Sequence, residues 1–548
     1  MPSKKLILGI LLVIFINLLQ AFLTPLAEDE AYYWVWSQHL DWGYFDHPPM
    51  VAWWISLGYS IFQNELGVRF LSAFMSGMTI LLCWKILQPK TKQEEKLFGL
   101  ILGSCVVFHA FGFLTTPDAP LLFFTVFYLF TLKNFLEKNT WTTMFLIGIA
   151  FAGIMYSKYH GILVIGFTLF PILSNLWRNP KFYLAILFSL VLYAPHLNWL
   201  YEHDFSPISY HFSERSADEK FEIIKLVNYI GMVFLGCAPF LVYFIWKAIF
   251  RFKIENPFEK SVKALAILPV VFFLFSTFKD NVQPQWLLIS FVAMAFISFW
   301  FWNKQPKNKT FYVLGLIGIG LIFLLRILIA MPSISPLYKD KDFALTAGKL
   351  SSEKVVLEKY QEASLFLFYN PQREVAVHRT LGNRKSQYTL WDWEESFNGQ
   401  TVEYISPWVK SEHSFKGLKN RDYFIKKIEN YQTYHLIEIR TDVNNLKFSK
   451  DTMILGIIIT NGHDRSIEIG PNSLLKMNLN YYQDHQYNVI ASTPISSETI
   501  ELKPFEQEKI QIKIPRIDQN GKFHANFGIH YSPIGTTYVS KVIQIENP

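Results

Sequence analysis

The chain has few cysteines and few charged residues for its size. Only three of its 548 residues are Cys (Cys83, Cys105 and Cys237), and all three fall in apolar stretches, so a disulfide-built scaffold is excluded. Charged residues make up 17% of the chain and hydrophobic residues 51%, which excludes a disordered protein. There is no internal repeat, no low-complexity tract and no Gly-rich phosphate loop. A collagen-like protein is therefore excluded, and no nucleotide cofactor is expected.

The charge that is present is unevenly distributed. Residues 1–331 contain 44 charged residues, or 13% of that part, whereas residues 332–548 contain 51, or 24%. The first part predicts a membrane domain and the second a soluble region. The net charge of +7 is weak evidence for nucleic acid, because the basic residues lie in short loops between apolar stretches.

About eleven apolar stretches are long enough to cross a hydrocarbon core. Together they predict an α-helical polytopic membrane domain over 1–331. The N-terminal stretch could imitate a signal peptide, but no small-residue cleavage site follows, so we expect it to be the first transmembrane helix. Residues 50–62 are too short to span and predict an amphipathic helix at the membrane surface. The stretches are 6–24, 68–87, 97–114, 119–136, 141–157, 160–177, 182–199, 226–247, 262–278, 285–302 and 311–331.

Loop charge predicts the orientation. With the N-terminus in the cytoplasm, the inner loops hold 18 Lys and Arg against five acids, and the outer side holds seven against 14. This asymmetry follows the positive-inside rule. An odd number of spans then puts the C-terminal region outside the cytoplasm, so we expect a multi-pass protein of the cytoplasmic (inner) membrane with a periplasmic C-terminal region.

The soluble region divides into two expected parts. Residues 332–430 predict a small α/β unit, with strands at 354–357, 363–369, 374–378 and 401–405. Residues 431–548 show alternating strands with turn signals between them, which is typical of a β-sandwich. Its expected strands are 435–440, 453–460, 474–482, 499–502, 509–514, 525–531 and 538–545.

The outer segments of the membrane part hold its chemically active side chains. All seven of its histidines lie in outer loops or at outer helix ends, together with Asp29, Asp46, Asp118, Lys158 and Arg215. We expect a polar site on that face; loops that are simply hydrophilic are the alternative. Carboxylates at the end of a first span, under an aromatic surface helix, are expected to be partly desolvated, which suits general-base work. Helix capping is the competing interpretation of these acids.

Several short motifs in these segments resemble one known family. They are the Asp29-Glu30 pair at the outer end of the first span, Asp46-His47-Pro48-Pro49 before a surface helix, and Thr116-Pro117-Asp118-Ala119-Pro120. Supporting stretches are Tyr156–Tyr159, Pro195–Trp199 and Gln283–Trp286. In this order the motifs are similar to those of bacterial GT-C integral-membrane glycosyltransferases, in the superfamily of dolichyl-phosphate-mannose protein mannosyltransferases and aminoarabinose (ArnT-like) transferases.

The resemblance implies transfer of a sugar, with inversion, from a polyprenyl-phosphate donor to an envelope acceptor: lipid A, a glycan or a protein. It makes Asp29 the base for the acceptor hydroxyl and Glu30 its structural partner in the catalytic pair. Asp118 would orient basic side chains, and Lys158, beside Tyr159, would face the donor phosphate.

Asp46 and His47 fall on the pair that lies before Pro-Pro in aminoarabinose transferases. The resemblance implies that the acid contributes to a divalent metal site near the lipid phosphate, and His211 is a second candidate ligand. Hydrogen-bonding roles for the histidines remain open, because their spacing shows no fixed coordination pattern.

Two positions depart from the aminoarabinose transferases. Tyr32 stands where they have Arg, and His47 where they have Lys. The phosphate charge could therefore be met by Lys158, Arg215 or His211 instead. A transporter or flippase of lipid-linked saccharides, or a ligase, is the alternative function, although the midspan regions carry almost no charge and no repeat is present.

Overall fold

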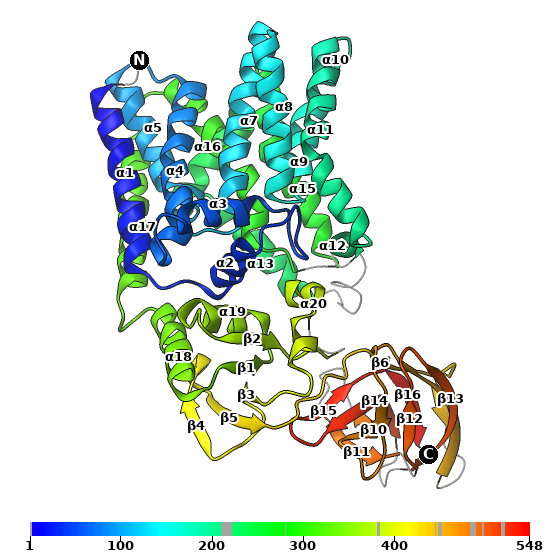
Figure 1. Cartoon of the computed structure of the whole chain (residues 1–548). Helices are drawn as coiled ribbons and strands as arrows, with labels where there is room; N and C mark the ends of the chain where they lie inside the picture. Colours follow the sequence, from blue (N-terminus) through cyan, green and yellow to red (C-terminus); the bar gives the residue numbers. More distant parts are fainter. Residues whose placement is uncertain are drawn as a thin grey trace. The chain divides into compact units, whose positions relative to one another are not determined.

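The computed structural model describes residues 3–209, 222–279, 281–380, 384–443, 445–447, 452–482, 489–495, 498–516 and 521–547. The chain divides into two compact units, Met1–Lys341 (unit 1) and Asp342–Pro548 (unit 2). Unit 1 is helical and unit 2 is built around β-sheets (Figure 1).

Unit 1 is a bundle of long helices with short helices at their ends. Its α-helices are α1 (Lys4–Leu23), α2 (Glu28–Gln38), α3 (Met50–Tyr59), α4 (Glu65–Leu87), α5 (Lys92–Ser104), α6 (Val106–Ala110), α7 (Asp118–Lys138), α8 (Trp141–Ser157), α9 (Gly161–Leu169), α10 (Leu173–Leu176), α11 (Pro180–Glu202), α12 (Ser206–Ser209), α13 (Ile223–Leu235), α14 (Val242–Arg251), α15 (Pro257–Ser276), α16 (Leu288–Asn303) and α17 (Lys309–Ala330). Short 3₁₀ helices are η1 (Phe170–Ile172), η3 (Pro239–Leu241) and η4 (Pro284–Leu287).

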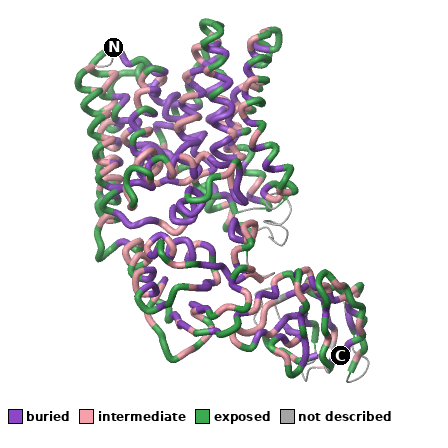
Figure 2. The backbone as a smooth tube through the Cα atoms, viewed as in Figure 1, coloured by how far each residue is buried: buried purple, intermediate pink, exposed green. Residues whose placement is uncertain are grey.

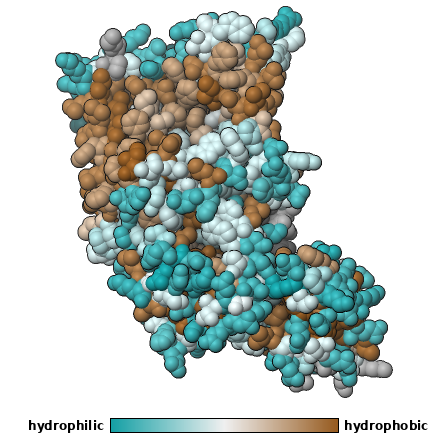
Figure 3. All heavy atoms as spheres, in the orientation of Figure 1, coloured by the Kyte–Doolittle hydropathy of each residue, from teal (hydrophilic) through white to brown (hydrophobic). Residues whose placement is uncertain are grey.

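Burial separates the centre of the bundle from its edge. In α16, every residue from Leu288 to Phe299 is buried (Figure 2). In α1 and α17, only 17% of the most apolar 18-residue window is buried inside the protein. Their exposed faces are largely apolar, and Figure 3 shows a band of hydrophobic side chains across the visible face of the bundle. A helix whose apolar residues face outward is suited to lipid, so unit 1 is a multi-pass membrane domain.

Six described helices are long and apolar enough to span a membrane, or seven if a bent pair counts as one span. The eleven predicted stretches fall mainly on helices, but several fail this test for physical reasons. The stretch at 97–114 breaks at Cys105, α8 has only 17 residues, and α13 meets the η3–α14 segment at a bend of 83°. The number of spans therefore stays a prediction. The six are α1, α4, α7, α11, η4 with α16 (Pro284–Asn303), and α17.

Side-chain caps set the ends of several long helices. The Asn64 side chain accepts hydrogen bonds from the first backbone N–H groups of α4, and Thr140 caps α8 in the same way. Asp118 lies in the first turn of α7, where a negative charge is favoured by the helix dipole. These signals fix where the chain enters α4, α7 and α8.

The predicted helix at 50–62 is α3. Its Trp54 and Ile55 are buried against the bundle, whereas Leu57 is 62% exposed. This two-sided pattern fits an amphipathic helix; its place at a membrane surface stays a prediction.

Unit 2 begins within α18 (Pro336–Leu350), which starts in unit 1. Its first sheet has the strand order β2-β1-β3-β5-β4. Strands β2, β1 and β3 are parallel, and β5 pairs antiparallel with both β3 and β4. The strands are β1 (Lys354–Leu357), β2 (Glu374–Val377), β3 (Val402–Ser406), β4 (His413–Lys416) and β5 (Asp422–Ile428), with helices α19 (Tyr360–Tyr369), α20 (Gln387–Trp391), η5 (Trp393–Phe397) and η6 (Leu418–Asn420).

The strand predicted at 363–369 is wrong, because these residues lie in helix α19. Short apolar runs such as Leu365–Phe368 fit either structure by periodicity. Here the segment connects two parallel strands, β1 and β2, and a parallel pair needs a crossover, usually helical.

The rest of unit 2 consists of an eight-stranded and a three-stranded sheet. Side chains from both sheets, such as Ile457 and Phe527, share one buried core, so the two sheets form a sandwich. The predicted segment 538–545 is two strands rather than one. The strands are β6 (Ile437–Arg440), β7 (Asn445–Lys447), β8 (Thr452–Asn461), β9 (Ile467–Ile469), β10 (Leu475–Tyr482), β11 (Val489–Pro494), β12 (Ile500–Leu502), β13 (Gln507–Pro515), β14 (Gly521–Tyr531), β15 (Gly535–Tyr538) and β16 (Ile543–Asn547).

The α/β and β-sandwich parts are packed together within unit 2. Val356 and Tyr404 of the first sheet belong to the same buried cluster as the sandwich residues. The domain boundaries expected at 331/332 and 430/431 stay predictions.

Candidate functional site

A fully buried ion pair organises the entry to α2. Glu30 and Arg69 are both 0% exposed, and Arg69 Nε donates to Glu30 Oε1 at 2.8 Å while its Nη2 pairs with Oε2. The guanidinium also donates to acceptors of the segment before α2: the carbonyl oxygens of Ala21, Thr24 and Pro25 and the Thr24 hydroxyl. We call Glu30 and Arg69 the clamp. It ties α4 to the chain between α1 and α2.

The clamp also holds the segment before α7. The backbone N–H of Thr115 donates to Glu30 Oε1 at 2.9 Å, and the Thr115 hydroxyl lies 2.8 Å from that of Ser72 on α4. Glu30 therefore fixes two segments that are 85 residues apart in sequence. Its enclosed carboxylate holds these segments together, and the part of Glu30 in a catalytic pair stays a prediction.

A second buried ion pair joins the start of α7 to the end of α8. Lys158 Nζ donates to the two Asp118 carboxylate oxygens at 2.8 and 3.0 Å, and both side chains are 6% exposed. Lys158 is the C-cap of α8, so its side chain leaves the helix at its end. We call the end of the bundle formed by residues 24–49, the start of α7 and the end of α8 the site end.

Asp46 is buried at the site end. Its Oδ2 accepts a hydrogen bond of 2.8 Å from the Tyr32 hydroxyl. Tyr32 thus occupies the position at which the resemblance expects an arginine, and contacts the acid directly. His47 is half-buried, and its ring lies 6.2 Å from that of Tyr33.

Tyr159 follows Lys158 in the sequence, and its side chain contacts the ring of His196. Its hydroxyl lies 3.3 Å from His196 Nε2, and His196 Nδ1 lies 2.6 Å from the Trp42 carbonyl oxygen. Burial, with the nearby Tyr193 and the Asp46 charge, raises the pKa of Tyr159 well above its usual value. The phenol therefore stays protonated at neutral pH and can donate a hydrogen bond.

Asp29 lies in the first turn of α2 and is exposed, whereas the adjacent Glu30 is buried. Consecutive helical residues point about 100° apart, so the two acids face different surroundings. The expected partial desolvation therefore belongs to Glu30 rather than Asp29. Exposure leaves the Asp29 carboxylate accessible to a substrate.

Two predicted residues, His211 and Arg215, lie outside the described residues. Their part in phosphate or metal binding stays a prediction. Among the residues that the structure describes, Asp46 belongs to no group of three His, Cys, Asp or Glu side chains close enough to hold one ion.

Sequence reasoning missed Arg69 as the partner of Glu30. Its signal was present: Arg69 stands near the start of the apolar stretch 68–87 and is the first charge after Glu65. An ionisable residue within a membrane span needs an internal partner. The identity of that partner could not be predicted from the sequence, because Glu30 lies 39 residues from Arg69.

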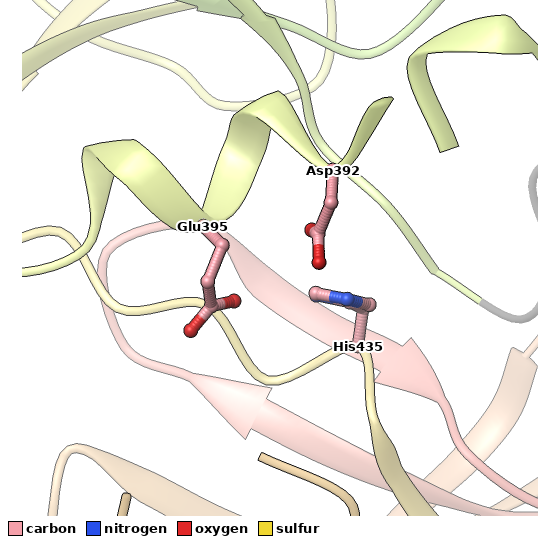
Figure 4. A group of neighbouring side chains, drawn as sticks. All are labelled: Asp392, Glu395 and His435. Atoms are coloured by element: carbon pink, nitrogen blue, oxygen red, sulfur yellow. The ribbon is translucent and has the colours of Figure 1, made fainter. Parts of the chain in front are cut away.

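One group of metal-type side chains is found in the described part of unit 2: Asp392, Glu395 and His435, whose ligand atoms lie within 4.8 Å of one another (Figure 4). Both carboxylates are already ion-paired, Asp392 with Arg379 and Glu395 with Arg465. Burial and the Arg379 charge lower the pKa of His435 to about 3. Two guanidinium groups beside the cluster disfavour a further cation, so it is better described as an ion-pair network.

Sequence comparisons place the chain among known membrane proteins. The model of the family "Dolichyl-phosphate-mannose-protein mannosyltransferase" matches residues 46–199, which include Asp46, Asp118 and Lys158 but not Asp29. The lipid A galacturonosyltransferase RgtD of Rhizobium johnstonii is 24% identical over 310 residues. That alignment covers 52% of this chain and 62% of RgtD.

A second relative is the undecaprenyl phosphate-alpha-4-amino-4-deoxy-L-arabinose arabinosyl transferase 2 of Pseudomonas fluorescens. It is 26% identical over 218 residues, which cover 36% of each chain. The chain thus spans less than two thirds of the length of both named relatives.

Among solved structures, ArnT from Cupriavidus metallidurans in the apo state has the same fold. The TM-score is 0.59 at 13% identity, and the alignment covers 77% of this chain and 97% of that one. The chain is therefore a polytopic membrane protein with the GT-C fold and a β-rich C-terminal region. The family model, the two named relatives and this fold all agree with the resemblance, drawn from its motifs, to the superfamily of protein mannosyltransferases and ArnT-like transferases.

Proposed function

We propose that this protein is an inverting glycosyltransferase that transfers a sugar from a polyprenyl-phosphate donor to an acceptor of the cell envelope. The observation that carries the proposal is the Asp118–Lys158 pair at the site end, where a buried lysine keeps hydrogen-bonding capacity. The ArnT of Cupriavidus metallidurans binds undecaprenyl phosphate, and the two named relatives are transferases of galacturonic acid and of aminoarabinose.

Lys158 is suited to the donor phosphate. An ammonium group has three N–H donors, and Lys158 donates two hydrogen bonds, both to the carboxylate of Asp118. A phosphate oxygen can accept from the same group without breaking the pair. Asp118 then fixes the direction of the ammonium group, so the group is in place as phosphate becomes the leaving group.

Asp29 is the proposed base. In one inverting displacement, it takes the proton of the acceptor hydroxyl while the acceptor oxygen bonds to the anomeric carbon. The bond from that carbon to the phosphate oxygen breaks, and the electron pair leaves with the polyprenyl phosphate. Lys158 stabilises this charge, and protonated Tyr159 can donate to a donor oxygen. Glu30 holds the segment that carries Asp29 through the clamp.

A divalent cation near the lipid phosphate remains part of the proposal, with Asp46 and His211 as its ligands. A carboxylate and an imidazole are suitable ligands for such an ion. Since the described residues do not complete a coordination set, no step of the transfer is assigned to the metal.

Mass spectrometry of envelope lipids and glycans, with and without the gene, tests the function and identifies sugar and acceptor. We expect loss of one sugar from lipid A, the favoured acceptor given the relatives, and accumulation of its polyprenyl-phosphate donor. A protein or another glycan losing the sugar would change the acceptor but keep the reaction. An intact envelope with lipid-linked sugar trapped in the inner leaflet would instead support the transporter or flippase.

The proposed site is periplasmic if the N-terminus is cytoplasmic. A reporter fused after Pro548 should then be active only outside the cytoplasm. Activity of that fusion inside the cytoplasm would reverse the topology and place the reaction on the other face.

A further inference from the structure

A cavity lies at the end of the bundle opposite the site end. It has a volume of about 410 Å³ and is lined by the ends of α4, α7 and α16 and the start of α15. At 1.5 Å per residue, Lys133 and Glu137 lie about 22 and 28 Å along α7 from Asp118. Because a hydrocarbon core is about 30 Å thick, the cavity lies near the opposite membrane boundary.

The cavity has apolar walls and three charged groups. Phe258 and Trp300 pack with their rings 6.1 Å apart and form part of the wall. Lys133, Glu137 and Glu259 line the same space. Lys133 and Glu259 are half-buried and Glu137 is exposed, so the cavity opens to the surface of the protein.

Each charge keeps bonding capacity for a ligand. Lys133 Nζ donates to the Ile86 carbonyl oxygen at 2.9 Å, which caps the last turn of α4 and leaves further N–H groups. Glu259 Oε2 accepts the backbone N–H of Glu255 at 2.7 Å, and a carboxylate can accept several more hydrogen bonds. In the described part of the chain, neither Glu137 nor Glu259 forms an ion pair within 4 Å.

The balance of these charges selects the kind of ligand. Two carboxylates against one ammonium repel a purely anionic headgroup, although such headgroups favour basic pockets at membrane surfaces. A ligand with both a phosphate and a primary ammonium satisfies all three groups: phosphate on Lys133 and ammonium on Glu137 and Glu259. Acyl chains would lie along the apolar wall and the neighbouring bilayer.

We propose that this cavity binds the headgroup of a phosphatidylethanolamine molecule from the leaflet opposite the site end. This lipid site is separate from the proposed transfer site, and lipid binding there does not depend on the transfer reaction. The proposal requires that the protein distinguish a primary ammonium from a quaternary one, because only the primary group donates hydrogen bonds to the carboxylates.

The test uses the full chain in detergent with added phosphatidylethanolamine, phosphatidylcholine or phosphatidylglycerol of matched acyl chains, and native mass spectrometry to count retained lipid. We expect phosphatidylethanolamine to be retained about tenfold better than the other two, as for one charge-assisted hydrogen bond. Glu137→Gln with Glu259→Gln should abolish this preference. Glu255→Gln is the matched control, since Glu255 pairs with Lys304 on the surface and should change nothing.

Equal retention of phosphatidylcholine, better retention of phosphatidylglycerol, or a preference that survives the double variant would each overturn the proposal. Displacement of the lipid by an equal concentration of soluble phosphoethanolamine would also overturn it, in favour of a small water-soluble ligand. Thermal unfolding of each variant checks that the helices remain packed, because Gln keeps the acceptor for the Glu255 N–H group.

Discussion

Buried charges serve different purposes in the two units. In unit 1 they form separate pairs, Glu30–Arg69 and Asp118–Lys158, each linking helices across a gap of about 40 residues. In unit 2 they merge into one network around Glu394, which contacts His378, Arg379 and His435. In a separate ion pair the cation can keep N–H groups for a ligand, whereas in a network the charged groups bind one another.

The two pairs of unit 1 also differ from each other. Arg69 is saturated by the Glu30 carboxylate and by carbonyl and hydroxyl oxygens around it. Lys158 donates two hydrogen bonds, both to the Asp118 carboxylate. The enclosed arginine therefore stabilises the fold, and the lysine is the group suited to a substrate.

The largest effect is expected from Asp29→Asn. Asn keeps the size of the side chain but cannot accept the acceptor's proton, so the transfer rate should fall by about 10²–10⁴-fold. Donor binding and thermal unfolding should stay unchanged, because Asp29 is exposed. The measurement is sugar transfer by purified protein, with Glu28→Gln as the neighbouring control. Near wild-type turnover of Asp29→Asn would move the base elsewhere, with Asp118 next.

Arg69→Met should destabilise unit 1 by about 3–5 kcal/mol, because it leaves the Glu30 carboxylate buried without its partner. Pairing it with Glu30→Gln should recover part of that loss, since the uncompensated charge is then gone. Thermal unfolding in detergent measures both. If Arg69→Met unfolds at the wild-type temperature but loses activity, the clamp would be part of the chemistry instead.

Unit 2 should lose stability on acidification. Burial and nearby arginine charges lower the pKa of His435 to about 3 and that of His463 to about 4, so both are neutral when folded. Their contribution is complete above the unfolded value near 6.5 and decreases as the pH falls below it.

We expect unit 2 to be about 2–4 kcal/mol less stable at pH 5 than at pH 7, because two unfolded histidines take up protons. Hydrogen exchange of strands β8 and β14 measures this change. His435→Gln should flatten the pH dependence, whereas a change at the exposed His413 should not. A stability of unit 2 that does not vary from pH 7 to pH 5 would contradict the network.

Glu394 responds at lower pH. Burial alone would raise its pKa, but the hydrogen bond from His378 and the charge of Arg379 outweigh this and lower the pKa to about 2. Its contribution is present above the unfolded pKa and is lost as the pH falls toward 2.

The smallest effect is expected at the donor phosphate. Replacing the whole pair, Asp118→Asn with Lys158→Met, avoids a lone buried charge and should preserve folding. Donor binding should weaken by about 10–100-fold, the effect of one charged hydrogen bond. Binding of a polyprenyl phosphate to the purified variant measures this, with Lys341→Met as a control lysine that pairs with Glu65. Unchanged binding would shift attention to Arg215, His211 or a metal.

The sequence predicts the architecture of the protein more completely than it predicts the contacts between side chains. Long apolar stretches predicted the helices of unit 1, and alternating apolar and polar residues predicted most strands of unit 2. Helix α19 was mistaken for a strand, because a short apolar run carries no usable period and only the parallel β1–β2 pair requires a helix there. Asp118 and Lys158 were found as separate motifs, but their direct contact depends on where α7 begins and α8 ends. The pairing of Arg69 with Glu30 depends on how the helices pack, and a local sequence pattern does not contain that information.

The clamp has a consequence for how the protein enters the membrane during synthesis. Arg69 stands one turn from the start of α4, a helix that must pass into lipid, and an arginine without a partner makes insertion of such a helix less favourable. Glu30 is made 39 residues earlier, so it is already at the membrane when α4 emerges from the ribosome. We therefore expect α4 to insert more favourably once α1 and α2 are in place, because the partner of Arg69 is made before Arg69 itself.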